Sequence, residues 1–187
     1  MVGLISHHML PWTSWPSCGP FLELYGVVLI QNIMIASSQK GLMTEIQCEL
    51  NFTKYGIILS KPITNDCRYD YIADINSKLY RIQCKAAAIS QDGSFIQFGC
   101  HSTNIRNNTE YCYTDADIDY FYTEYNGQGY LVPVNKGGKK DKTLRFSAKQ
   151  NHSTIMWAKD FTLEKILKEE LNYDFENSTW SNTVLTR

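Results

Sequence analysis

The residues best suited to chemistry in this chain are Asp70, Gln83 and Lys85. Gln83 and Lys85 are two positions apart, so in a β-strand their side chains lie next to each other on one face. Asp70 comes earlier, where a neighbouring strand could bring its carboxylate to the same place. An acid, an amide oxygen and an ammonium group at one point suit a hard metal ion and the water that it activates. Asp66 is a nearby alternative acid, but the turn in which it lies favours a structural role.

Two strands joined by a tight turn are predicted to position these groups. Residues 69–75 are rich in aromatic and β-branched side chains, Asn76-Ser77 suits a hairpin turn, and residues 79–85 alternate between two faces. The acid then begins the first strand, and the amide and the ammonium end the second. This hairpin predicts a candidate site at one end of a sheet surface.

A helix is predicted ahead of the hairpin, over residues 39–55, with Ser37 or Ser38 as its N-cap and Gly56 just after its end. Its predicted core face is an apolar stripe with a four-residue repeat, formed by Leu42, Ile46 and Leu50. Two acids, Glu45 and Glu49, lie one turn apart beside that stripe. On the residue pattern alone, both acids are expected on a solvated surface.

The rest of the chain is predicted from turn signals and short apolar runs. Asp92-Gly93 indicates a turn that gives the first hairpin a third antiparallel partner. The remaining expected segments are strands at 57–60, 85–90, 94–100, 118–125, 130–134 and 143–148, and a polar loop at 101–114. A last helix, capped by Thr162, is expected to bury Leu163, Ile166, Leu167 and Leu171.

The ordered set of motifs resembles the PD-(D/E)XK nucleases. Pro62, Asp70 and Gln83-Cys84-Lys85 follow the signature of that family, in the variant that has Gln as the second acid. The further matches are Lys40-Gly41, Glu45 and Gly56 upstream, and residues 117–121 and 130–133 downstream. The pattern covers residues 37–170 and is most similar to the group I intron homing endonucleases of this superfamily.

The resemblance implies an α/β (α+β) fold, with a restriction-endonuclease-like mixed sheet flanked by an N-terminal and a C-terminal helix. It implies a Mg²⁺-dependent endonuclease acting on double-stranded DNA, with Mn²⁺ as a substitute ion and a dimer or tetramer as the working form. Asp70, Gln83 and Glu45 would bind the metal, and Lys85 would orient the attacking water or stabilise charge in the transition state.

The glutamine variant has one negative charge fewer than a three-acid site, so a lower metal affinity is expected. The alternative function is therefore a catalytically weak or inactive nucleic-acid-binding module of the same fold. Such a module would bind DNA in a salt-dependent way, and neither EDTA nor loss of Asp70 or Lys85 would abolish that binding.

Basic residues gather in one glycine-rich segment, although the chain as a whole has a net charge of -1 and a pI near 6.4. Flexible lysines neutralise backbone phosphates without reading sequence, so this segment is a candidate DNA contact. A solubilising loop is an equally good interpretation. The candidate DNA-binding residues are Lys136, Lys139, Lys140, Lys142 and Arg145.

The six cysteines show no CxxC pair, so free thiols in a reducing cytoplasm are expected. A third hypothesis, a secreted disulfide-bonded protein, is suggested by these cysteines and by four Asn-x-Ser/Thr sequons. Mass spectrometry for disulfides and glycans would separate the two. No membrane partner is expected, because the apolar run at 21–36 is interrupted and too short to span a bilayer.

Three regions are predicted. Residues 1–36 have no Lys or Arg and contain three prolines, so they are expected to be an extension outside the domain. An upstream start-site error, with Met34 as the true first residue, is one hypothesis for them. Residues 37–172 form the predicted endonuclease domain, and residues 173–187 a polar tail.

Overall fold

A computed structural model of the chain describes residues 37–64, 66–104, 109–147 and 154–175. These residues all belong to the second of the two units into which the chain divides, Ala36–Arg187. The predicted extension at 1–36 lies outside the described residues, as do residues 176–187 of the predicted tail. Two residues at the start of that tail contact Tyr55. The Tyr173 hydroxyl donates to the Tyr55 carbonyl, and the Phe175 ring packs on the Tyr55 ring.

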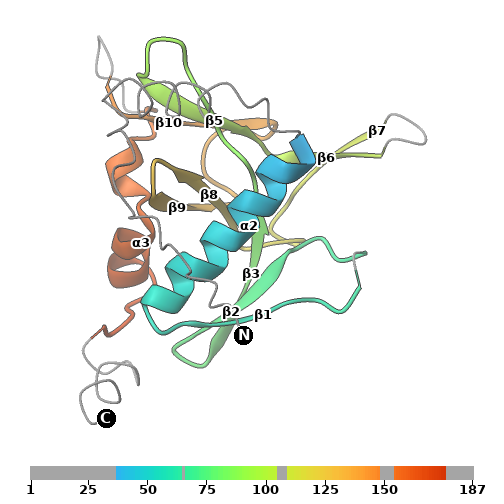
Figure 1. Cartoon of the computed structure of the whole chain (residues 1–187), viewed down its shortest axis with the longest axis vertical. Coiled ribbons are helices and arrows are strands. Elements are labelled where there is room, and N and C mark those ends of the chain that lie inside the picture. The colour runs from blue at the N-terminus through green and yellow to red at the C-terminus, as the bar shows by residue number, and fades with distance from the viewer. Residues whose placement is uncertain (1–36, 65, 105–108, 148–153, 176–187) are drawn as a thin grey trace, which may run out of the picture. The chain divides into compact units, whose positions relative to one another are not determined.

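The elements of the domain follow one another as helix, strands and a final helix (Figure 1). In chain order they are α2 (Ser37–Lys54), β1 (Ile58–Ser60), β2 (Tyr71–Ile75), β3 (Lys78–Cys84), β4 (Ala88–Ile89), β5 (Phe95–Gly99), β6 (His101–Asn104), β7 (Thr109–Cys112), β8 (Tyr120–Tyr125), β9 (Gln128–Pro133), β10 (Asp141–Arg145), the 3-10 helix η1 (Ala158–Asp160) and α3 (Leu163–Glu169). Neither described helix is long and apolar enough to cross a membrane.

The main sheet has five strands in the order β1-β2-β3-β8-β9. All neighbours in it are antiparallel except β3 and β8, which run parallel with Ile82 opposite Tyr120. An ion pair between Arg81 and Asp119, with Nη2 and Oδ1 3.1 Å apart, joins these two strands at the start of β8. A mixed sheet with a helix before it and a helix after it confirms the predicted fold class.

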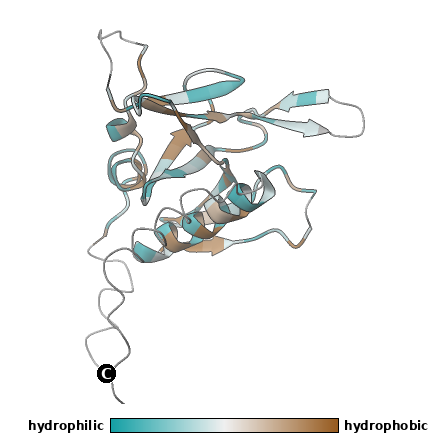
Figure 2. Ribbon diagram, turned by 45° about the horizontal axis from the view of Figure 1, so that its top comes forward, coloured by the Kyte–Doolittle hydropathy of each residue, from teal (hydrophilic) through white to brown (hydrophobic). Residues whose placement is uncertain are grey.

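The strands β8 and β9, at one side of the main sheet, separate two hydrophobic cores. Tyr122 and Leu131 face the core that α2 and α3 cover, whereas Phe121 and Val132 face the core shared with the three-stranded sheet β10-β5-β4. The alternation follows from the two-residue period of a strand. Figure 2 shows the hairpin β6–β7, largely in white and teal, projecting away from the rest of the domain.

The predicted hairpin at the centre of the sequence is present as β2 and β3. Asn76 and Ser77 have φ angles of 53° and 63°, the pair of left-handed conformations that a type I′ turn requires. The Asn76 side chain also donates hydrogen bonds to the carbonyl oxygens of Leu171 and Asn172. The turn is therefore tied to the end of the last helix, while the opposite end of the hairpin is left for the candidate site.

The predicted core face of α2 was wrong. Leu42, Ile46 and Leu50 are 54, 53 and 47% exposed, and the buried residues are Thr44, Cys48, Asn51 and Phe52. The Phe52 ring packs against Tyr122 with centroids 6.1 Å apart, and Asn51 donates to the Tyr122 hydroxyl at 2.7 Å. Two stripes at the same spacing compete on this helix. The small side chains of Thr44 and Cys48 let the helix approach the sheet on the second face.

Two other predictions about the middle of the chain were wrong. Residues 85–100 do not add a third antiparallel strand to the hairpin, because β8 pairs with the free edge of β3 and β4–β5 belongs to the second sheet. The predicted loop at 101–114 contains the antiparallel strands β6 and β7, with His101 opposite Cys112. A two-stranded hairpin with few apolar side chains has no clear period, so sequence patterns do not reveal it.

The final helix is as predicted. The Thr162 side chain accepts a hydrogen bond from the backbone N–H of Lys165, as an N-cap does. The side chains of the predicted apolar face are at most 8% exposed, namely Leu163, Ile166, Leu167 and Leu171.

Candidate active site

Asp70 and Gln83 meet at the open end of the β2–β3 hairpin. Tyr71, the first residue of β2, pairs with Ile82 of β3. Asp70 comes just before Tyr71, and its backbone N–H donates to the Ile82 carbonyl at 2.9 Å. This register puts the two side chains opposite each other, and Gln83 Nε2 donates to Asp70 Oδ2 at 2.6 Å. The same oxygen accepts the backbone N–H of Cys84 at 2.7 Å. Asp70 thus lies beside Gln83, where the preceding strand was expected to bring it.

Lys85 follows β3 directly and is half-buried. Its backbone N–H donates to the Tyr122 carbonyl, which continues the parallel pairing of β3 and β8. Its Nζ donates to the His101 carbonyl at 3.0 Å and lies 4.8 Å from the centroid of the Tyr113 ring. Burial lowers the pKa of the Lys85 ammonium, and the nearby charge of Asp70 opposes that effect.

Glu45 reaches the same area from α2. Its carboxylate forms an ion pair with Lys61, whose Nζ is 2.9 Å from Oε2, and Lys61 also contacts the Tyr71 hydroxyl at 3.4 Å. Glu49, expected on the surface, is exposed but accepts a hydrogen bond from the Tyr71 hydroxyl at 2.5 Å. Tyr71 and Lys61 therefore link the acids of the helix to the strand that begins beside Asp70.

The electrostatics of Asp70 reflect these neighbours. Burial raises the pKa of the Asp70 carboxyl, the hydrogen bond from Cys84 opposes this, and the negative charge of Glu45 raises it further. Lys85 and Lys61 lower the pKa to a smaller extent. The carboxylate is thus held in a place where its negative charge is under-compensated, and a further cation would stabilise it.

The donor set suits a hard divalent ion. Mg²⁺ in proteins is bound through one or two carboxylates, with other oxygens completing its shell. Asp70, Glu45 and the amide of Gln83 offer two carboxylates and one carbonyl oxygen. Within the described part of the chain, no group of three or more His, Cys, Asp or Glu side chains could hold a metal. A metal held by Asp70 and Glu45 would therefore need a further ligand, such as the Gln83 side-chain oxygen.

Lys142 has to be corrected as a candidate DNA contact. It is 1% exposed, and its ammonium donates to the carbonyl oxygens of Val134 and Lys136 and lies 5.5 Å from the centroid of the Phe121 ring. Burial lowers its pKa. Lys142 thus closes the turn between β9 and β10 instead of facing solvent.

The other residues of the basic segment are more accessible. Lys136 and Lys139 are exposed, and Lys140 is exposed but forms an ion pair with Glu110 at 3.2 Å. Arg145 is half-buried, with its guanidinium 5.0 Å from the Phe95 ring centroid. Among the predicted DNA contacts, Lys136 and Lys139 are the cations that the structure presents most freely.

Three residues of the site were missed by sequence reasoning: Lys61, His101 and Tyr113. Lys61 precedes Pro62 of the signature, and that adjacency was the only available signal for it. His101 acts through its carbonyl and Tyr113 through its ring, on a hairpin that was predicted to be a loop. Backbone groups and ring faces contribute here in ways that residue type alone does not indicate.

The sequence profile of the PD-(D/E)XK endonucleases matches residues 35–164. This range is well over half of the 187 residues, and the chain belongs to the PD-(D/E)XK endonuclease family. The family membership makes the protein a nuclease and therefore a hydrolase. A search among curated proteins gave no match.

The fold has counterparts among solved structures. The bacterial homing endonuclease I-Ssp6803I superposes with a TM-score of 0.58, at 20% identity, over 71% of this chain and 93% of that chain. At this identity the likeness shows the fold, which is restriction-endonuclease-like. MepB matches with a TM-score of 0.32, at 17% identity, over 59% of this chain and 86% of that chain, and this likeness is too low to support an argument.

Proposed function

We propose that this nuclease is a metal-dependent endonuclease that hydrolyses phosphodiester bonds in double-stranded DNA. The observation that carries the proposal is the meeting of Asp70 and Gln83 at 2.6 Å, with the Lys85 ammonium held beside the same strand end by the His101 carbonyl. Glu45, which influences Asp70 electrostatically, completes the set of polar groups.

Mg²⁺, with Mn²⁺ as a substitute, would be held by Asp70, by Glu45 and by the side-chain oxygen of Gln83. When bound, such an ion supplies Lewis acidity and lowers the pKa of water. The Gln83 amide nitrogen and the Cys84 N–H orient the Asp70 carboxylate. Lys61 would release Glu45 from its ion pair for this role.

Lys85 has the role of a cation next to the reacting phosphate. Its ammonium is anchored by one carbonyl and one ring face, so its position is set before substrate arrives. A pre-positioned cation stabilises the charge that develops on a phosphoryl group during cleavage. Burial lowers the pKa of the Lys85 ammonium, which makes it a stronger acid and hydrogen-bond donor than an exposed lysine and suits orientation of the attacking water.

A second candidate function is a DNA-binding module of the same fold with weak or no catalysis. The ion pair between Glu45 and Lys61 favours it, because that pair occupies the carboxylate that would join Asp70 in binding a metal. This alternative predicts salt-dependent DNA affinity that survives EDTA and survives substitution of Asp70 or Lys85.

The decisive experiment is cleavage of supercoiled plasmid over a protein dilution series, with Mg²⁺ or with EDTA. We expect nicking that needs the metal and that falls by about 100-fold in Lys85→Ala. Lys159→Ala, at an exposed lysine on η1, is a matched control that should cleave like wild type. Calorimetric titration of Mg²⁺ into wild type and Asp70→Ala separates a rare-site enzyme, which binds metal, from an inactive module, which does not.

Compartment and assembly are part of the proposal. The cysteines at 48, 67, 84, 100 and 112 are free thiols, which supports a reducing cytoplasm. A dimer or tetramer is supported by the exposed apolar side chains of α2, because such patches often mark interaction surfaces. Light scattering on the eluting protein tests the assembly.

A further inference from the structure

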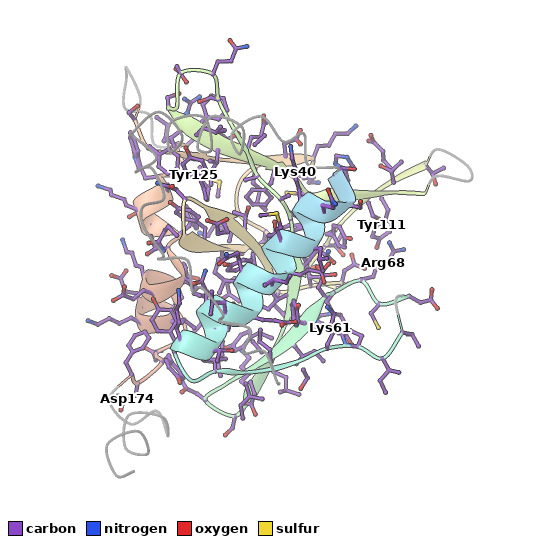
Figure 3. The ribbon with its side chains drawn as sticks, viewed as in Figure 1. Lys40, Lys61, Arg68, Tyr111, Tyr125 and Asp174 are labelled. Atoms are coloured by element: carbon purple, nitrogen blue, oxygen red, sulfur yellow. The ribbon has the colours of Figure 1, made fainter. Side chains whose placement is uncertain are left out.

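Two cations lie on the faces of neighbouring tyrosines beside the candidate active site. The Arg68 guanidinium carbon is 4.0 Å from the centroid of the Tyr111 ring, and Lys85 Nζ is 4.8 Å from that of Tyr113. The two tyrosines are two positions apart along β7 and its continuation, and their ring centroids are 6.4 Å apart. Figure 3 shows Arg68 and Tyr111 side by side near the hairpin β6–β7. Arg68 and Lys85 therefore each lie over one ring of this tyrosine pair.

The orientation of Arg68 is set by its neighbours. Its Nη1 donates to the Ser102 hydroxyl at 3.4 Å, and its guanidinium carbon lies over the Tyr111 ring. The Tyr111 hydroxyl in turn donates to both oxygens of Asp117 at 3.0 Å. Asp117 also accepts from the backbone and the hydroxyl of Thr114, so the tyrosine rests on a fixed turn. A guanidinium held in this way loses little rotamer freedom when it binds a ligand.

The charge of Arg68 is available to a ligand. The side chain is exposed, and among the described residues no carboxylate lies within ion-pair distance of it. Arg81, by contrast, is paired with Asp119. Asp117 is the acid that Arg68 influences electrostatically, but its oxygens are already committed to Tyr111 and Thr114. An exposed, oriented guanidinium without a counter-ion is suited to an anion from outside the protein.

We propose that Arg68 binds a backbone phosphate of the nucleic acid, next to the phosphate that Lys85 approaches, and that Tyr111 is its positioning residue. This inference rests on the proposed function. Arg68 is two positions before Asp70. A nucleic-acid strand that crosses the site would therefore bring its phosphates past both Arg68 and Lys85. Guanidinium groups match phosphate oxygens with two parallel hydrogen bonds. The contact sets the position of the strand and does not read its sequence.

The test is binding of a fluorescein-labelled, mixed-sequence DNA duplex in EDTA, followed by anisotropy over a series of NaCl concentrations. We expect Arg68→Ala to weaken binding by about 3- to 10-fold and to reduce the slope of log affinity against log salt by about 1. Arg68→Lys keeps the charge and should retain most of the salt slope. In cleavage assays, Arg68→Ala should raise KM more than it lowers kcat.

Lys78→Ala is the matched control. Lys78 is also an exposed cation above a tyrosine, 4.9 Å from the Tyr80 ring centroid, but it lies at the turn end of the β2–β3 hairpin. We expect its affinity and salt slope to equal those of wild type. If Arg68→Ala and Lys78→Ala lose the same affinity, the inference about Arg68 is wrong. If wild type shows no salt-dependent binding either in EDTA or with Ca²⁺ in place of EDTA, the proposed function fails instead.

A double-mutant cycle tests the positioning role of Tyr111. Tyr111→Leu removes the ring face and should weaken binding in the wild-type background, but it should cause no further loss in Arg68→Ala. Tyr111→Phe keeps the ring and should restore most of the affinity. Equal losses from Tyr111→Leu in both backgrounds would show that the ring acts independently of Arg68 and would overturn this part of the proposal.

Discussion

Asp70, which is half-buried, and Lys142, which is buried, are two charged side chains of one domain, and their surroundings differ in kind. Lys142 donates to two main-chain carbonyls and lies near the Phe121 ring, so neutral groups hold its ammonium. Asp70 accepts both of its hydrogen bonds on one oxygen and has another acid, Glu45, among its neighbours. Burial favours the neutral form of both groups, because it raises the pKa of Asp70 and lowers the pKa of Lys142. A pKa shifted by burial therefore does not by itself identify a functional charge. Asp70 differs from Lys142 because other charged side chains, Glu45, Lys61 and Lys85, converge on it.

The largest expected difference between the two charges is in catalysis. Asp70→Asn keeps an acceptor for the Cys84 N–H but removes the negative charge, so we expect cleavage to fall by about 1,000-fold. The fold should be retained, which circular dichroism checks. Asp74→Asn, at an exposed acid further along β2, is the control and should cleave normally. Comparable cleavage by both variants would remove Asp70 from the site.

Gln83→Glu sharpens the comparison by adding a second negative charge beside that of Asp70. The variant replaces the donor that meets Asp70 at 2.6 Å with a second carboxylate. Without divalent metal we expect unfolding free energy to fall by about 2–3 kcal/mol at pH 8, because a charged hydrogen bond is lost and like charges meet. Saturating Mg²⁺ should restore most of this loss, and urea unfolding with and without the ion measures it. A loss that Mg²⁺ does not reverse would contradict metal binding at this pair.

Lys142→Met should change stability and leave DNA binding unchanged. It leaves the Val134 and Lys136 carbonyls without their donor, so we expect a loss of about 1–2 kcal/mol in unfolding free energy. The salt slope of DNA binding should stay the same. Lys139→Met, at an exposed neighbour, should leave stability unchanged.

The effect of Lys142→Met should also depend on pH. Because burial lowers the pKa of Lys142 in the folded protein, the unfolded chain binds more protons in the interval below 10.5, the ordinary lysine value. The unfolding free energy of wild type minus that of the variant therefore increases as the pH rises through that interval. Urea unfolding of both proteins at several pH values measures the difference, and a difference that shrinks with rising pH would contradict the assignment.

Local patterns were sufficient wherever a few neighbouring residues specify the geometry. Asn76-Ser77 adopts the turn that its residue types favour, and the alternation that ends at Lys85 sets the face of Gln83. Thr162 begins α3 for the same kind of reason. By contrast, α2 carries two stripes with equal spacing, and the stripe with the larger side chains is the exposed one. Which stripe is buried depends on Tyr122, which belongs to a strand far along the chain.

The sequence by itself determined the hairpin, its acid, amide and ammonium, and the family to which these motifs belong. Tertiary structure decided which charges are free. Lys142 and Lys139 are three residues apart in one basic segment, yet one is buried under the β9–β10 turn and the other is exposed. Arg68 was oriented by a tyrosine on a hairpin that no period in the sequence indicated. The physical reason is that strand alternation and turn preferences act between adjacent residues, whereas burial and charge compensation depend on which distant segments pack together.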